Sequence, residues 1–149
     1  MAVGEICNRD VIILQRDATI LDAAKLMRQH HVGDVLVVEE RGDVRVPVGI
    51  VTDRDLVVEI MATGLDQTVI TVGDIMVSGL VTVKENAGIF ETIQTMRSKA
   101  VRRVPVVDEQ GALAGILALD DLLELLSEEL LAIAKLVTVQ QKKETRSRH

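Results

Sequence analysis

The first third of the chain combines short apolar runs with one longer amphipathic segment. The run Val11–Leu14 predicts a strand. The next segment predicts a helix that opens with a capping box formed by Thr19 and Asp22. Apolar residues at helical spacing form its inward stripe: Ile20, Ala23, Ala24 and Met27.

Three more elements complete this pattern. The apolar run VLVV at 35–38 is typical of a strand that is buried on both faces. A turn at Gly42 leads to a further strand, which ends in GIV at 49–51, and a helix is expected to begin near Asp53. The predicted order of elements is therefore β-α-β-β-α.

The same order returns in the second half of the chain. VGEIC at 3–7 matches VGDIM at 72–76, and GIVTDRDL at 49–56 matches GILALDDL at 115–122. Between these pairs the second copy predicts a strand at Leu80–Val83, a helix with an inward stripe, the run VPVV, a turn at Gly111 and a last helix near Asp120. Internal similarity of this kind predicts two structural repeats.

We assign residues 1–68 to the first repeat, 69–134 to the second, and 135–149 to the end of a helix and a basic polar tail. Gly64 is the expected terminator of the helix before the link. One repeat has too little apolar surface to fold alone, so the fold class expected is α+β, with two repeats packed about a pseudo-twofold axis. Leucines on more than one face of the last helix favour a partner helix and a homodimer. The tail at 140–149 is expected to fray.

Composition excludes several classes of function. The chain of 149 residues is 48% apolar, which is enough for a packed core. Phe90 is its only aromatic residue, so base stacking on single-stranded nucleic acid lacks a platform. A net charge of −6 argues against sequence-independent binding of DNA across the whole surface, and we expect no nucleic-acid partner. Cys7 is the only cysteine, which excludes an intrachain disulfide and a thiolate zinc cluster.

Targeting, membrane and catalytic signals are also missing. The first ten residues do not resemble a secretory signal, and glutamates interrupt the leucine-rich stretch LLELLSEELLAI, so we expect a cytoplasmic protein without membrane contact. No phosphate-binding loop or nucleophile elbow is present, which argues against an enzyme and against a catalytic cofactor. Adjacent His30 and His31 cannot chelate one metal from a helix, so no metal site is predicted.

The repeats resemble the CBS domain family, which is named after cystathionine β-synthase; two tandem copies form a Bateman module. The resemblance covers nearly all of residues 3–130 and rests on VGDIM (72–76), RRVPVVDEQG (102–111) and GIVTDRDL (49–56). It implies a regulatory module that binds an adenosine-containing ligand, such as AMP, ADP or ATP, in clefts between the repeats. It also implies pairing into dimers and transmission of a conformational change to an effector protein, which the resemblance does not identify.

The motif T-x-x-D at Thr52 and Asp55 has two interpretations. As a capping box it contributes about 1 kcal/mol of helix stability and says nothing about function. As a ligand site, its carboxylate can accept hydrogen bonds from both ribose hydroxyls, near a helix start that favours anions. In the second copy Thr52 is replaced by Ala118, whereas the acid remains as Asp121, and a cap alone has no evident need for that acid. This retention favours the ligand interpretation.

The resemblance assigns residues of both repeats to each cleft. In the first cleft Asp55 and Thr52 bind the ribose side, an apolar slot takes the adenine, and two arginines reach the phosphates, with any Mg²⁺ brought by the nucleotide. These residues are Ile50, Thr52, Asp55, Leu80, Val81, Arg102, Arg103 and Pro105.

The second cleft is expected to be degraded or adapted to a less anionic ligand. It places Gly33 and Asp34 where the first cleft has its arginine pair, and an acid there repels phosphate. Its expected residues are Val11, Ile12, Gly33, Asp34, Ala118 and Asp121. The alternative function is a structural or interaction module whose clefts bind nothing and whose long C-terminal helix is the working surface.

Overall fold

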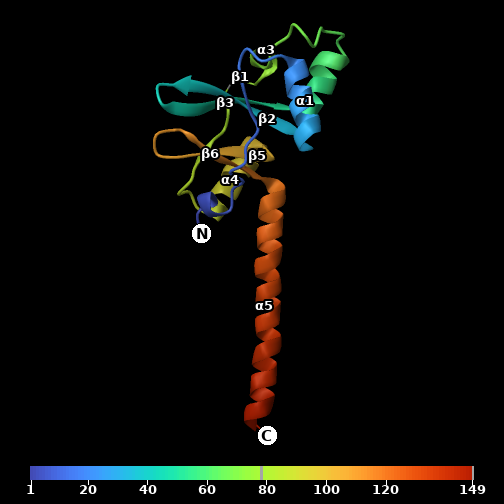
Figure 1. Ribbon diagram of the computed structural model, residues 1–149. Helices are drawn as coiled ribbons and strands as arrows, with labels where there is room; N and C mark the ends of the chain where they lie inside the picture. The colour runs from blue at the N-terminus through green and yellow to red at the C-terminus, as the bar shows by residue number, and fades with distance from the viewer. Residues whose placement is uncertain (78, 149) are drawn as a thin grey trace. The chain divides into compact units, whose positions relative to one another are not determined.

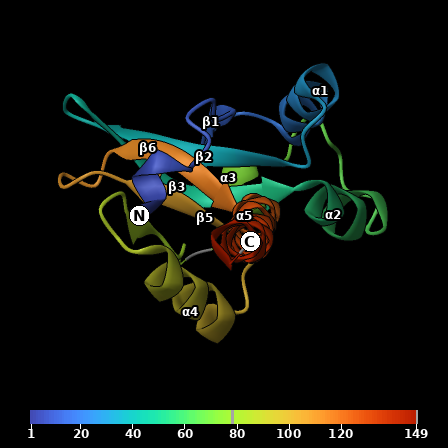
Figure 2. The same ribbon diagram turned by 90° about the horizontal axis from the view of Figure 1, so that it is seen from below.

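We analysed a computed structural model that describes residues 1–77 and 79–148. The chain divides into two compact units, residues 1–117 and the part that begins at Ala118, and each is described by itself (Figure 1). The first unit contains two sheets of three strands, in the orders β1-β2-β3 and β4-β5-β6. Helices α1 and α4 lie on opposite sides of this pair of sheets (Figure 2).

The first repeat follows the predicted order. A 3-10 turn, η1 (Val3–Glu5), precedes β1 (Ile13–Gln15), α1 (Ile20–His30), β2 (Asp34–Arg41) and β3 (Val44–Thr52). The chain then enters α2 (Asp53–Asp55), which continues as the π-helical segment η2 (Leu56–Met61). Strands β1 and β2 are parallel, and β2 and β3 form an antiparallel hairpin with an irregular register between Val37 and Val38. As predicted, Gly64 follows this helix in the left-handed region, with φ of 73°.

The second repeat contains α3 (Val72–Ile75), β4 (Val83–Lys84), α4 (Ile89–Lys99), β5 (Arg103–Val107) and β6 (Leu113–Ala118). Strand β4 is parallel to β5. Both first strands begin later than the apolar runs predicted: β1 at Ile13 instead of Val11, and β4 at Val83 instead of Leu80. The reason is that each strand extends only where the next strand pairs with it, and an apolar run does not show where pairing starts.

Each repeat is completed by the opening segment of the other. The amides of Val3 and Gly4 donate to Ala87 O and Glu85 O in the second repeat, each at 2.9 Å. Symmetrically, the amides of Val72 and Gly73 donate to Ala18 O and Arg16 O in the first, at 2.8 and 3.0 Å. The matching segments VGEIC and VGDIM are therefore exchanged between the two repeats.

Glycines allow this exchange. A Cβ on Gly49 would lie 2.5 Å from Met76 Sδ, and one on Gly115 would lie 2.6 Å from Cys7 Sγ and 2.8 Å from Asn8 O. These are the equivalent contacts in the two copies. They explain why both strands end in a motif that begins with Gly-Ile.

The core of the first repeat is aliphatic. Its buried cluster combines Ile20, Ala23 and Met27 of α1 with alternate residues of β2, residues of β3 and η2, and Val72 from the exchanged segment. Ala24, the fourth residue of the predicted stripe, is only half-buried. Val35, Leu36, Val37 and Val38 are all fully buried, as expected of a strand that is covered on both faces.

The second unit consists mainly of α5 (Leu119–Arg148). The expectation of a frayed tail is wrong within the described residues, because α5 stays helical up to Arg148. Glutamine, lysine and arginine in its last turns favour helix, and the basic residues of the last turn suit the negative end of the helix dipole. In the described residues, no helix combines the length and the hydropathy that crossing a bilayer requires.

Candidate ligand-binding site

The T-x-x-D motif forms a complete capping box at the junction of β3 and α2. The amide of Thr52 donates to Asp55 Oδ2 at 2.9 Å, and the amide of Asp55 donates to Thr52 Oγ1 at 3.2 Å. Both side chains are half-buried. No hydrogen bond to Asp55 Oδ1 is made by the described residues, so this oxygen can accept one from a ligand.

Two other motifs of the chain make the same box. Thr19 with Asp22 and Thr71 with Asp74 show the same pair of hydrogen bonds, at 3.0 to 3.3 Å, but on exposed surface. The box at Thr52 differs only in being half-buried. Capping geometry alone therefore does not mark a ligand site.

Asp121 of the second repeat also takes part in helix capping. Its Oδ2 accepts the amide of Ala118 at 2.9 Å, which is half of the capping box that Thr52 and Asp55 make. The acid in the second copy therefore has a capping role without the threonine. Its retention does not favour ligand binding, contrary to the prediction.

An ion pair joins the second repeat to the start of β2, opposite the end of β3. In the antiparallel register Asp34 lies opposite Thr52, and Arg103 Nε lies 2.6 Å from Asp34 Oδ2. Arg103, at the start of β5, is thereby brought beside the strand end that carries the T-x-x-D motif. Arg103 and Asp34 were predicted to belong to different clefts, but these two residues are in contact.

Asp53 also lies at this junction and was not predicted as a site residue. Its amide donates to Gly33 O at 2.9 Å, and its Oδ2 would lie 3.2 Å from a Cβ on Gly33. The only available signal was its place directly after Thr52 in TDRD. Together, Asp34, Asp53 and Asp55 make this region acidic, with Arg103 as a compensating charge.

The environment of Asp34 shifts its titration. Burial raises the pKa of the Asp34 carboxyl, Arg103 opposes the rise, and the charge of Asp53 adds to it. The net effect is a pKa above the ordinary value of 3.8. Desolvation therefore outweighs the ion pair, and Asp34 is easier to protonate than an exposed aspartate.

The remaining residues expected in the first cleft come from several elements. Ile50 lies in β3 and is half-buried, Leu80 and Val81 are half-buried just before β4, and Pro105 is buried within β5. Arg102 is exposed and makes no ion pair with the described residues. Their common role in one adenine slot stays a prediction.

The residues expected in the second cleft are divided between the two units. Val11 and Ile12 lie just before β1, and Gly33 and Asp34 lie at the start of β2. Ala118 and Asp121 belong to the second unit, at the start of α5. The second cleft therefore also stays a prediction.

A separate groove of about 450 Å³ lies between α1 and the α2–η2 segment. Its lining is mainly apolar, and its one charged side chain is Asp53. Such a surface does not suit a phosphate. In the described residues, no group of three His, Cys, Asp or Glu side chains is arranged to hold a metal ion.

Comparison with known proteins agrees with the tandem architecture. The sequence model of the CBS domain matches residues 3–62 and 72–128. The chain is 38% identical over 122 residues to the CBS domain-containing protein YhcV of Bacillus subtilis, which covers 81% of this chain and 82% of the relative. It is 36% identical over 124 residues to protein MK0525 of Methanopyrus kandleri, covering 83% of this chain but only 62% of that protein.

A solved structure shares the fold. The CBS domain pair of protein MJ0100, in complex with 5′-methylthioadenosine and S-adenosyl-L-methionine, has a TM-score of 0.74 and 25% sequence identity. The similarity covers 87% of this chain and 98% of that chain. With two matched domains and an α+β fold built from two exchanged repeats, the chain belongs to the CBS domain family.

Proposed function

We propose that this chain is a regulatory module that binds an adenosine-containing ligand at the Thr52–Asp55 end of β3. Asp55 accepts hydrogen bonds from the ribose hydroxyls, and Thr52 lines the same site. Ile50, Leu80, Val81 and Pro105 hold the adenine. Ligand binding changes the relative stability of two arrangements of the repeats, and an effector protein responds to that change.

The observation that carries this proposal is the Arg103–Asp34 ion pair opposite Thr52. It brings a cation of the second repeat beside a half-buried carboxylate of the first, as a site between repeats requires. The adenosine-containing ligands bound by the MJ0100 domain pair support the same ligand class.

The charges of the site favour a ligand of low negative charge. Asp53 and Asp55 follow the end of β3, and Arg103, the arginine that reaches this region from the second repeat, is paired with Asp34. A triphosphate would therefore meet repulsion unless Arg103 left Asp34. We therefore rank adenosine, methylthioadenosine and S-adenosylmethionine before ATP, with AMP between them. Exposed Arg102 is the second cation available to a phosphate.

Calorimetric titration tests this function. Adenosine, methylthioadenosine, S-adenosylmethionine, AMP and ATP would each be titrated into the protein, with guanosine and GTP as controls. Saturable binding of adenosine-containing ligands, and none of the guanosine series, is the expected result. Equal binding of both series, or no binding at millimolar concentration, would overturn the proposal.

A second function has one observation in its favour. The exposed apolar side chains of α5 suit a protein-interaction module. If adenosine-containing ligands fail to bind while α5 associates with a partner, this second function would replace the first.

A further inference from the structure

The segment that directly follows the T-x-x-D motif is a π-helix. In η2 the hydrogen bonds join residues five apart, in place of the four of an α-helix. The same spacing continues to the end of the segment: the amide of Ala62 donates to Val57 O at 2.9 Å, and the amide of Leu65 donates to Ile60 O at 3.1 Å. Segments of this kind are rare and occur frequently at functional sites.

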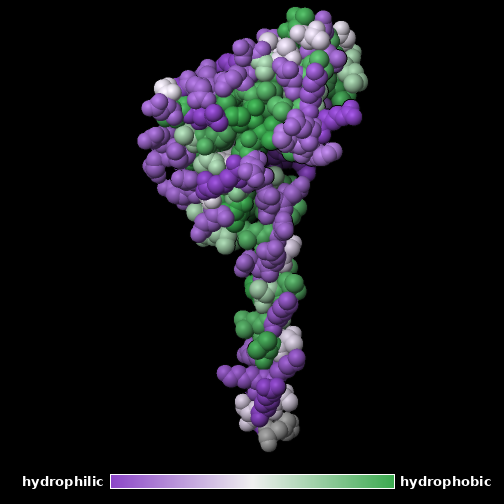
Figure 3. All heavy atoms as spheres, in the orientation of Figure 1, coloured by the Kyte–Doolittle hydropathy of each residue, from purple (hydrophilic) through white to green (hydrophobic). Residues whose placement is uncertain are grey.

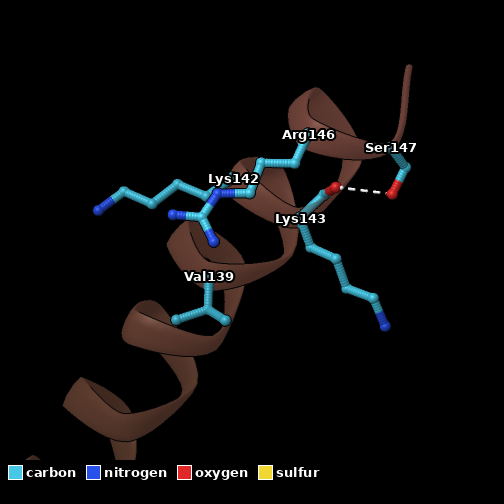
Figure 4. Close-up of a pocket in the computed structure, with 5 residues that line it drawn as sticks. All are labelled: Val139, Lys142, Lys143, Arg146 and Ser147. Carbon is cyan, nitrogen blue, oxygen red and sulfur yellow. Dashed lines mark hydrogen bonds between the residues drawn. The ribbon is translucent and has the colours of Figure 1, made fainter. Parts of the chain in front are cut away.

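The equivalent segment of the second repeat is an α-helix. Leu122 corresponds to Leu56 at the start of η2, and it lies in α5, which is α-helical throughout its described residues. The last turns keep this form, with Ser147 Oγ donating to Lys143 O four residues earlier at 2.9 Å (Figure 4). The G-I-x-x-x-x-D-L motif that both copies share therefore does not impose the π form.

Branching at Cβ distinguishes the two segments. Both are rich in apolar residues, and Figure 3 shows apolar side chains along the first part of α5. In η2, however, Val57, Val58 and Ile60 branch at Cβ, which crowds the turns of an α-helix. The corresponding residues of α5 are leucine, glutamate and leucine, which are better helix formers. The preference for the α form is therefore weaker in η2 than in α5.

Hydrogen bonds to the rest of the first repeat hold the chain on both sides of η2. Before it, the amide of Asp53 donates to Gly33 O at 2.9 Å. After it, the amide of Leu21 in α1 donates to Gln67 O at 3.0 Å. Between these two points Ile60 is buried in the core. With both sides held, the extra residue of the segment has two places: the π turn, or the link that leads to Gln67.

The helical register of η2 determines one wall of the apolar groove beside α1. Ile60, Met61 and Leu65 all line this groove. In the π register the amide of Leu65 is bonded to Ile60, five residues earlier. In an α register it would be bonded to Met61, four residues earlier. Because Ile60 is buried and Met61 is exposed, a change of register moves Leu65 along the wall and reshapes the groove.

We propose that η2 is a register switch that carries the state of the ligand site to the groove, an inference that rests on the proposed function. Asp55 Oδ1 accepts a hydrogen bond from the ligand one residue before η2 begins, so the ligand contacts the turn on which the π-helix is built. The ligand shifts the balance between the π and α registers through its different affinity for the two forms.

Hydrogen–deuterium exchange of the full chain tests the switch. Exchange of the amides of residues 60–65 would be measured alone and with saturating adenosine, methylthioadenosine or S-adenosylmethionine, while calorimetry records binding. For the ligands that bind, we expect at least a threefold change in these exchange rates, because a change of register breaks and remakes the hydrogen bonds of these amides. The amides of residues 26–30 in α1 are the internal control and should change less.

The two possible failures are distinguishable. Binding with unchanged exchange at residues 60–65, or with the same change in the control amides, overturns the switch and leaves the proposed function in place. Absence of binding in the calorimeter overturns both.

Deletion of Val58 separates the register from the ligand site. Val58 is exposed and belongs neither to the groove lining nor to the capping box. Its deletion removes the residue that the π turn accommodates and fixes the α register, whereas Val58→Thr keeps both the length and the branching and is the matched control. The deletion protein is expected to bind the ligand but to lose the change in exchange, which Val58→Thr keeps. A deletion protein that responds like the parent overturns the proposal. If circular dichroism shows that the deletion protein is unfolded, the measurement on the parent decides alone.

Discussion

The ion pair with Asp34 controls whether Arg103 is available to bind a ligand. The carboxylate holds the guanidinium at 2.6 Å and is itself desolvated, with Asp53 as a second negative charge nearby. A phosphate at this site must compete with Asp34 for Arg103. In the proposed site, protonation of Asp34 would remove the competitor, so phosphate binding would depend on pH.

Replacing Asp34 by Asn tests this link. At pH 7.5 the variant is expected to bind AMP about three- to tenfold more tightly than the parent, because Arg103 is free to make a charge-assisted contact. The ratio of the two affinities should shrink toward one as the pH falls through the raised pKa of Asp34. Adenosine has no phosphate and serves as the control ligand, for which the ratio should stay near one. A ratio for AMP that does not change with pH would contradict the competition.

The free energy of unfolding should also depend on the titration of Asp34. Because the folded-state pKa of Asp34 is raised, its charged form costs stability above that pKa, and the cost disappears as the pH falls toward the ordinary value. Asp34→Asn should therefore be the more stable protein at pH 7, with the difference closing at lower pH. Urea unfolding at several pH values measures this difference.

Thr92 has a buried hydroxyl group without a hydrogen-bond partner among the described residues. It lies in α4 where the first repeat has Ala23, so the repeat itself shows that a hydroxyl is unnecessary there. Thr92→Val keeps the shape and removes the unsatisfied group, and we expect the free energy of unfolding to rise by about 1 kcal/mol. Urea denaturation followed by circular dichroism measures it, and a loss of stability would reveal a partner for the hydroxyl.

At the scale of elements, the exchanged segments restrict which residues the adjacent strands can carry. Gly49 in β3 and Gly115 in β6 each pass against the opening segment of the other repeat, at distances that leave no room for a Cβ. The contact at Gly115 includes backbone oxygen of Asn8, which cannot move as a side chain can. Replacing Gly115 by a residue with a Cβ should therefore disturb the packing between the two repeats.

Gly115→Ala is expected to lower the free energy of unfolding by about 1–3 kcal/mol, the range typical of overpacking. Gly88→Ala is the control, since a Cβ on Gly88 meets nothing within 4 Å. Its cost should stay below about 1 kcal/mol, because Gly88 caps α4 and Ala is a poorer cap. Thermal unfolding of both variants compares them, and equal losses would show that the close approach at Gly115 is relaxed without cost.

At the scale of the whole molecule, neither repeat of residues 1–117 is complete without the other. Val72 of the second repeat is buried in the core of the first, and Val3 of the first is hydrogen-bonded to the second. A ligand held by Asp55 of one repeat and Arg103 of the other would therefore act on a joint that both share. The proposed regulatory function would use this shared joint.

Much of this organisation could be predicted from local signals. The order of elements, the two repeats and the box at Thr19 and Asp22 follow from apolar spacing and capping chemistry, and the structure confirms them. The Arg103–Asp34 ion pair could not be predicted, because it joins residues far apart in sequence and depends on how the sheets pack. The exchange of VGEIC and VGDIM has no local signature either, although their similarity showed that they are equivalent.

The central claim, that Asp55 binds an adenosine-containing ligand, is tested most directly by a thermal-shift measurement on two capping variants. Asp55→Asn and Asp74→Asn alter the same kind of box, one at the proposed site and one elsewhere. A bound ligand raises the midpoint of the parent by mass action. We predict that Asp74→Asn keeps this ligand-dependent rise and that Asp55→Asn loses it. An equal rise in both variants, or none in the parent at millimolar ligand, would reduce the Thr52–Asp55 motif to a helix cap.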